Sequence, residues 1–203
     1  MLTEKRIPAE KRKRMIIRAA IDVFSESNYR VAKVSDIAER AGITDPMIYK
    51  FFKSKSELFQ EILITTSEQT IVKFFTREFF QPENLQTKDD YIVTIEKSLW
   101  AYFNNMEQFQ KELKVYYQAI SEVDESDVRK VLRDSYQNYA SIYESILQKG
   151  TDDGLLHLTM DVRTIAWDIV GFTIQQSTLF IIGFYDVQDM QTLLRKRIQT
   201  WIP

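Results

Sequence analysis

The first sixty residues carry apolar side chains at the spacing of short α-helices. Within residues 9–26 the apolar positions recur three or four residues apart and predict an amphipathic helix, at Ile17, Ala20, Ile21 and Phe24. The pattern predicts two further short helices, over residues 34–41 and 45–52. Gly42 lies between them and can take the left-handed backbone conformation with which many helices end.

From residue 55 onward the apolar positions follow longer helical stretches. Turn-forming residues interrupt these stretches at positions 81–84, 124–127 and 150–154. The predicted helices cover residues 56–80, 88–104, 107–121, 125–149, 161–184 and 187–201. Because no β-hairpin signal occurs, the expected fold class is all-α with about nine helices in total.

Composition narrows the chemistry of the 203-residue chain. It contains no cysteine, which excludes disulfides and thiolate metal sites. Residues 1–14 are charged and lack the apolar stretch of a secretory signal, which favours a cytoplasmic location. The longest uncharged run, residues 169–185, is slightly short for a membrane span and has polar residues in its middle, so we expect a buried helix and no membrane partner.

Charge is distributed unevenly along the chain. Residues 1–58 contain thirteen Lys/Arg against eight Asp/Glu, a net charge of +5, whereas the remaining residues contain fourteen against twenty-one, a net charge of −7. A basic segment of this kind favours an anionic partner such as nucleic acid. The basic run at residues 11–14 can equally form the solvated face of a helix, and charge alone does not decide between the two.

The two short helices on either side of Gly42 fit a helix-turn-helix. Two helices that cross steeply through a short turn need a small side chain where they touch and a glycine where the chain reverses. Ala38 and Gly42 occupy these positions, and larger residues there should break the motif. Apolar contacts come from Ile37, Ile43 and Ile48. The second helix of such a motif can enter the major groove of DNA with its N-terminal side chains at the base edges.

This stretch resembles the N-terminal signature of the TetR/AcrR family of bacterial transcription regulators. The resemblance covers roughly residues 10 to 60 without a gap, whereas the rest of the chain agrees in length and helix order only. It rests on Arg14, Ile17, Ala20, Phe24, Tyr29, Val34, Ile37, Ala38, Ala41, Gly42, Ile43, Thr44, Ile48, Tyr49, Phe52, Lys55 and Leu58. The resemblance implies a three-helix DNA-binding domain over residues 8–68, which includes the start of a long fourth helix, and a larger helical ligand-binding and dimerisation domain over residues 69–203.

Five positions depart from the family's pattern. Asn28 replaces a common glycine, but asparagine also tolerates a left-handed backbone. Ala32 and Lys33 replace the hydroxyl residues that often begin the second helix, and Ser35 is a possible substitute cap. Pro46 suits the first turn of a helix. Lys50 stands where an aromatic residue or histidine is frequent and could reach a phosphate or a guanine edge.

By resemblance, nine residues are expected to bind DNA. Tyr49 and Lys55 are similar to the family's phosphate-contacting pair, which sets position on the duplex without reading sequence. Asp45, Met47 and Lys50 are expected to face bases, although Asp45 can also serve only as a helix cap. The full predicted set is Lys33, Ser35, Thr44, Asp45, Pro46, Met47, Tyr49, Lys50 and Lys55.

The C-terminal two thirds are rich in aromatic residues, for which a packed core is the simple explanation. The resemblance instead implies an inducer cavity with flat apolar walls and a few polar tips. The candidate lining residues are Trp100, Phe103, Tyr116, Tyr117, Tyr139, Tyr143 and Trp167. The last two helices are expected to form a four-helix dimer interface, again with core packing as the alternative. The candidate interface residues are Phe172, Gln176, Leu179, Phe180, Leu194 and Ile198.

The resemblance implies a transcriptional regulator that binds a palindromic DNA operator as a homodimer, most often a repressor that a small apolar or aromatic inducer releases. An enzyme is disfavoured because His157 is the single histidine and no glycine-rich phosphate loop occurs. No cofactor or metal is expected. A helical module that binds an acidic protein or a membrane would share the charge asymmetry, but only a regulator predicts salt-dependent, sequence-selective binding to duplex DNA.

Overall fold

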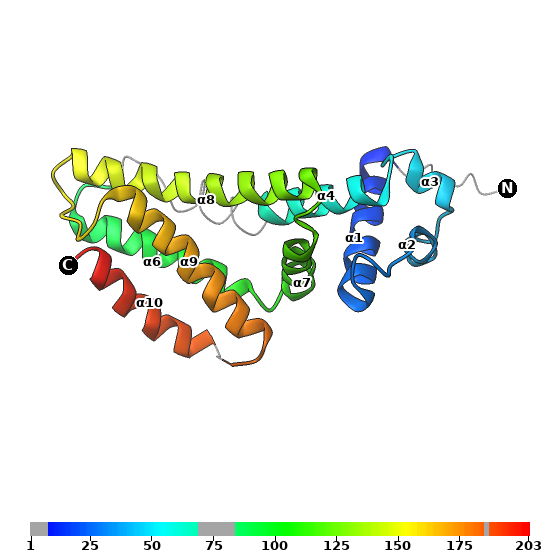
Figure 1. Ribbon diagram of the computed structural model, residues 1–203. Helices are drawn as coiled ribbons and strands as arrows, with labels where there is room; N and C mark the ends of the chain where they lie inside the picture. Colours follow the sequence, from blue (N-terminus) through cyan, green and yellow to red (C-terminus); the bar gives the residue numbers. More distant parts are fainter. Residues whose placement is uncertain (1–7, 69–83, 185–186) are drawn as a thin grey trace. The chain divides into compact units, whose positions relative to one another are not determined.

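A computed structural model describes residues 8–68, 84–184 and 187–203 (Figure 1). The described ranges contain nine α-helices, one 3₁₀ helix and no strand, which confirms the all-α prediction. The elements are α1 Ala9–Ser27, α2 Val34–Ala41, α3 Asp45–Tyr49, α4 Lys55–Thr66, α6 Lys88–Asn105, α7 Gln110–Gln118, η3 Ala119–Glu122, α8 Ser126–Asp152, α9 Val162–Ile181 and α10 Val187–Trp201. Within these ranges no helix is both long enough and apolar enough to cross a lipid bilayer.

Most predicted helices agree with the structure to within a few residues at each end. The third helix is shorter than predicted because it ends at Tyr49. The helix predicted over residues 107–121 is divided into α7 and η3. Helix α4 ends at Thr66. The part of the predicted helix 56–80 that follows residue 68 lies outside the described residues.

The chain forms two compact units that interleave in sequence. The first comprises Met1–Thr65 and Lys111–Val131, and the second comprises Thr66–Gln110 and Leu132–Pro203. The expected domain boundary after residue 68 lies close to the first division. Helix α7, η3 and the start of α8, however, belong with the helix-turn-helix rather than with the larger unit.

The core of the first unit is built on the apolar face of α1. Phe24 is fully buried, and its ring meets those of Tyr29 and Phe59 edge-on, with centroids 5.7 and 5.6 Å apart. The rings of Tyr29 and Phe59 stack on each other at 4.2 Å. Because Tyr29 lies just after α1 and Phe59 lies on α4, this aromatic cluster fixes where α1 ends relative to α4.

The core of the second unit contains several neutral hydroxyl groups among its apolar side chains. On α9, Thr173 and Ser177 are buried and form hydrogen bonds with Tyr139 and Tyr102 at 2.9 and 2.8 Å. Burial raises the pKa of Tyr139, which keeps this hydroxyl neutral. Trp201 at the end of α10 is also buried and donates a hydrogen bond of 2.6 Å from Nε1 to a carboxylate oxygen of Asp168 on α9. The two last helices are therefore tied together.

Candidate DNA-binding site

The turn between α2 and α3 has the backbone that the sequence predicts. Gly42 adopts φ 65° and ψ 35°, the left-handed region, and the amide of Ile43 donates to the carbonyl of Ala38 at 3.0 Å. Ala38 is 2% exposed, which agrees with a position where two helices touch. Ile37 and Ile48 are buried on the inner sides of α2 and α3. The helix-turn-helix is therefore formed as expected.

The segment between α1 and α2 has the positive φ that the sequence allows at Asn28, but the residue that caps α2 is not the one expected. Asn28 has φ 63° and is the non-glycine residue with positive φ among the described residues. The carboxylate of Asp36 accepts a hydrogen bond of 3.1 Å from the amide of Lys33 at the start of α2. Ser35 makes no cap, because its hydroxyl donates to Asp36. Asp36 thus replaces the hydroxyl cap that the sequence lacks.

Helix α3 presents part of its surface to solvent. Pro46 and Lys50 are exposed, and Tyr49 is 52% exposed although it is a large aromatic residue. Met47 is half-buried, and its sulfur lies 3.8 Å from a guanidinium nitrogen of Arg12 on α1. Asp45 is half-buried as well. Of the residues predicted to face bases, Lys50 is therefore the one that is fully open to a partner.

Three further predicted DNA contacts lie at the ends of the short helices. Lys33 and Ser35 are exposed at the start of α2, and Thr44 is exposed just before α3. The Thr44 side chain forms no hydrogen bond that would cap α3. Its hydroxyl is therefore not committed to a capping role.

The cations of the first unit fall into two groups. Some are paired with carboxylates, such as Arg40 with Glu26 at 2.8 Å and Lys13 with Glu61 at 2.6 Å. Within residues 8–58, five others are exposed and have no ion-pair partner among the described residues, namely Lys11, Arg14, Lys33, Lys50 and Lys53. Lys53 was not singled out by sequence reasoning, because a one-dimensional pattern does not show which cations find a partner.

The unpaired cations are near the exposed part of the helix-turn-helix. Lys33 precedes α2, while Lys50 and Lys53 follow α3. The first turns of α1 lie against α3, as the contact of Arg12 with Met47 shows, so Lys11 and Arg14 belong to the same end of the unit. Uncompensated positive charge next to an exposed helix is the electrostatic feature that a phosphate backbone requires.

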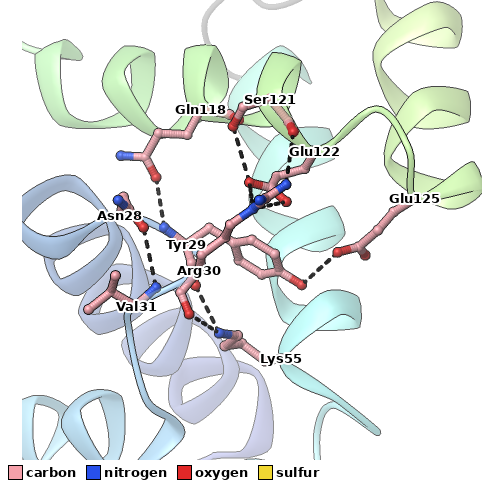
Figure 2. Close-up of polar contacts among 9 residues, drawn as sticks. All are labelled: Asn28, Tyr29, Arg30, Val31, Lys55, Gln118, Ser121, Glu122 and Glu125. Atoms are coloured by element: carbon pink, nitrogen blue, oxygen red, sulfur yellow. Dashed lines mark hydrogen bonds and ion pairs between the residues drawn. The ribbon is translucent and has the colours of Figure 1, made fainter.

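The surroundings of Lys55 differ from those expected of a phosphate-contacting lysine, the role that the resemblance implies. Its ammonium nitrogen donates to the backbone carbonyls of Tyr29 and Arg30 at 2.8 and 3.3 Å (Figure 2) and to that of Ala32 at 3.0 Å. It also lies 4.7 Å from the centroid of the Tyr29 ring. An ammonium group has three donors, and all three are used here. In this geometry Lys55 supports the segment between α1 and α2 and has no donor left for a phosphate.

The residues predicted to line an inducer cavity are divided between the two units. In the second unit Phe103, Tyr139 and Tyr143 are buried, and Trp100 is half-buried. Trp167 is 37% exposed on α9. The remaining two lie on α7 in the first unit, where Tyr116 is buried and Tyr117 is half-buried. Aromatic content alone therefore did not distinguish the core of one unit from that of the other.

The residues predicted to form a dimer interface mostly face inward. Phe172, Gln176, Leu194 and Ile198 are buried within the single chain, at 7% exposure or less. Leu179 and Phe180 are half-buried. A groove of about 430 Å³ runs between α9 and α10, with Leu179, Leu193, Lys196 and Arg197 among its lining residues. The alternative of core packing thus accounts for four of the six predicted residues.

Comparisons with known proteins agree with this geometry. The sequence profile described as "Bacterial regulatory proteins, tetR family" matches residues 16–62, which span α1 to α4. The chain is 28% identical over 171 residues to the fatty acid metabolism regulator protein of Bacillus subtilis (strain 168), a match that covers 83% of this chain and 82% of that protein. It is 25% identical over 189 residues to the probable acrEF/envCD operon repressor of Escherichia coli (strain K12), covering 90% and 84%.

Solved structures share the fold over nearly the whole chain. The transcriptional regulator FadR from Bacillus subtilis, solved in complex with stearoyl-CoA, superposes with a TM-score of 0.70 at 22% identity and covers 91% of this chain and 96% of that one. The relatives matched are transcriptional regulators and not enzymes. The family model covers α1 to α4, and together with these likenesses it indicates a TetR family transcriptional regulator.

Proposed function

We propose that this regulator is a repressor that binds a palindromic operator as a homodimer and is released from it by a small, largely apolar ligand. The observation that carries the DNA-binding part is the exposed α3, with Tyr49 and Lys50 open to solvent and four further unpaired cations in the same unit. Phosphate contacts from these cations supply affinity, and side chains of α3 supply sequence selection. The likeness to a probable operon repressor favours repression over activation.

For the DNA contacts we retain most of the residues implied by the resemblance. Pro46, Tyr49 and Lys50 are exposed on or next to α3, and we assign them to the operator interface together with Lys33, Ser35 and Thr44. Met47 and Asp45 are half-buried and take secondary roles. We replace Lys55 in the phosphate-contacting set with Lys53, Lys11 and Arg14, whose ammonium and guanidinium groups are exposed. Lys55 instead holds the backbone that leads into α2.

The proposed ligand enters the second unit. The buried polar side chains described there are neutral, among them Ser98, Ser135 and Thr173, so this interior suits an uncharged aliphatic or aromatic group. One similar protein is named as a regulator of fatty acid metabolism, and another was solved with stearoyl-CoA. A long-chain acyl thioester is therefore the first ligand to test, with its acyl chain as the part that the core would receive.

The proposed dimer uses the outer face of α9. Trp167, Gly171, Thr178 and Ile182 lie on one side of this helix, and Trp167 and Ile182 are 37% and 65% exposed. Among the described residues, apart from its chain neighbours and the backbone of α9 itself, no heavy atom lies within 4 Å of a Cβ built on Gly171, so a partner helix could approach closely there. A Trp167→Lys substitution should turn the dimer into a monomer in sedimentation equilibrium, because a twofold axis brings the two charges together. Val93→Lys on α6, at a site 41% exposed, serves as the matched control and should remain dimeric.

The DNA-binding proposal is tested by selecting duplexes from a random pool with the wild-type protein and measuring affinity by fluorescence anisotropy. Tyr49→Ala and Lys50→Ala should each weaken binding to the selected duplex by about tenfold or more. Lys97→Ala, at an exposed lysine on α6, should leave it unchanged. Selection of no sequence, or equal loss for Lys97→Ala and Lys50→Ala, would refute the proposal. Addition of stearoyl-CoA at micromolar concentration should release the selected duplex if an acyl thioester is the ligand.

A further inference from the structure

Helix α7 holds the C-terminal end of α1 through a single glutamine. The side-chain amide of Gln118 donates from Nε2 to the carbonyl of Phe24 at 2.9 Å, and its Oε1 accepts from the amide of Tyr29 at 3.0 Å. Both partners are backbone groups where α1 ends, and Figure 2 shows Gln118 reaching the Tyr29 amide. A glutamine side chain can donate and accept at once, so Gln118 serves as a helix cap supplied by a distant part of the chain.

The next residues of the same segment hold Arg30. Nε of Arg30 donates to both carboxylate oxygens of Glu122 at 2.8 and 3.0 Å, and a terminal nitrogen of its guanidinium donates to the carbonyl of Ser121 at 3.3 Å (Figure 2). The Glu122 side chain is only 8% exposed. A carboxylate with so little access to water needs a cation, and Arg30 supplies it. This ion pair raises the pKa of Arg30 further above its usual value.

Glu125, at the junction with α8, completes the contact. One of its oxygens accepts from the Tyr29 hydroxyl at 3.3 Å, and the other accepts from the Ser56 hydroxyl on α4 at 2.7 Å. From the other side, Lys55 binds the carbonyls of Tyr29 and Ala32. Residues 28–32, which lead directly into α2, are therefore held by α4 on one side and by residues 118–125 on the other (Figure 2).

Two ion pairs link the rest of α7 to α1. Glu112 binds Arg18 at 3.1 Å, and Lys111 binds Asp22 at 2.5 Å. The carboxylates of these two pairs are 12% and 20% exposed, against 8% for Glu122, and both pairs bind side chains within α1 rather than residues between α1 and α2. Gln118 and Glu122 are thus the positions at which α7 and η3 act most directly on the backbone that enters the helix-turn-helix.

We propose that Gln118 and Glu122 are positioning residues for operator recognition, although neither belongs to the helix-turn-helix. They fix the end of α1 and the segment before α2, and this sets the direction in which α2 and α3 are presented to DNA. The segment that carries them continues on both sides into the second unit, since α6 precedes it and α8 runs unbroken from Ser126 to Asp152. The inference rests on the proposed operator binding and assigns a second part of the chain to it.

The test compares a selected operator duplex with an unrelated duplex of the same length. Gln118→Ala and Glu122→Gln should each weaken operator binding by about tenfold, the factor expected when one or two hydrogen bonds that fix the binding geometry are lost. Binding to the unrelated duplex should stay within about twofold, because the unpaired cations are untouched. Gln137→Ala is the matched control, since Gln137 is exposed on α8 and its amide bonds only to Ser141 one turn away.

A second measurement separates positioning from loss of folding. An Arg30→Gln variant, alone and combined with Glu122→Gln, forms a double-mutant cycle. If Glu122 acts through Arg30, the double variant should lose as much operator affinity as either single variant and no more. The inference is overturned if both α7 and η3 variants bind the operator as wild type does, or if operator and unrelated-duplex affinities fall together with the thermal midpoint. Should the wild-type protein select no duplex at all, the proposed operator binding fails first, and the inference fails with it.

Discussion

Replacing Lys55 with methionine distinguishes the two roles that can be given to this lysine. Methionine keeps most of the aliphatic stem but removes the ammonium group that binds the carbonyls of Tyr29, Arg30 and Ala32. If the structural role is correct, the main effect of Lys55→Met is on the free energy of unfolding. If Lys55 instead contacts a phosphate, the main effect is on the affinity for DNA and on its dependence on salt.

The expected loss of stability follows from the three hydrogen bonds. Hydrogen bonds to a charged group contribute about 1.5–3 kcal/mol each when they are well buried. Lys55 is half-buried, so solvent screens part of this contribution. For the three bonds together we expect Lys55→Met to lower the free energy of unfolding by about 2–4 kcal/mol. Lys55→Arg should restore little of it, because a planar guanidinium cannot direct its donors to three converging carbonyls.

Urea denaturation followed by circular dichroism measures this loss. Lys13→Met is a matched control, because the ammonium of Lys13 pairs with Glu61 at a site where both side chains are about one third exposed, at 34% and 33%. Lys13→Met should lower the free energy of unfolding by less than about 1 kcal/mol. The reasoning is refuted if Lys55→Met unfolds within about 0.5 kcal/mol of wild type while the slope of log affinity against log salt falls by about one, as expected for a lost phosphate contact.

Two further predictions concern packing and capping in the second unit. A Cβ added at Gly150 would lie 2.6 Å from side-chain atoms of Leu156 and 3.0 Å from Tyr91. Gly150→Ala should therefore lower the free energy of unfolding, measured in urea, by about 1–3 kcal/mol. In a chain that already carries Leu156→Ala, Gly150→Ala should cost less, because the side chain it would meet has been shortened. The carboxylate of Asp161 accepts from the hydroxyl and the amide of Thr164, which holds the pKa of Asp161 below its ordinary value of 3.8. Its stabilisation is therefore present above pH 3.8 and is lost as the pH falls through the lower folded-state pKa, so the thermal midpoint of Asp161→Ala should lie below that of wild type at pH 7 and approach it in acid. A constant difference at all pH values would contradict that assignment.

The features that were predicted correctly from the sequence are those that depend on local backbone conformation. Asn28 and Gly42 both adopt positive φ, and the helices begin and end near the turn residues that flank them. The role of Lys55 could not be predicted in this way, because it depends on carbonyls 23 to 26 positions away in the sequence. The same holds for Gln118, whose partner Phe24 is 94 positions away.

The buried and exposed apolar positions of α9 could not be separated from the sequence, because this helix is apolar on more than one side. Ile165, Ile169 and Phe172 face the core of the second unit, but Trp167 and Ile182 are also apolar and lie on the exposed side. Helical periodicity identifies an interior face only when the opposite face is polar. On such a helix the sequence predicts burial without indicating whether the chain itself or a partner provides it.

Gly42 illustrates how the structure refines a correct prediction. From the sequence, a larger residue at Ala38 or Gly42 is expected to break the helix-turn-helix, yet in the described part of the chain no heavy atom beyond the adjacent residues lies within 4 Å of a Cβ built on Gly42. The constraint at this position is therefore the positive φ of 65° and not the space available. Gly42→Ala should cost about 1–2 kcal/mol of unfolding free energy, Gly42→Asn less, and Gly42→Val more, because asparagine tolerates this region and a β-branched residue does not. At Ala38, which is 2% exposed, the cost should instead rise with side-chain volume. Urea midpoints for Asn, Ala, Val and Leu at both positions test this difference, and an order at Gly42 that follows volume would show that packing, not backbone conformation, selects the glycine.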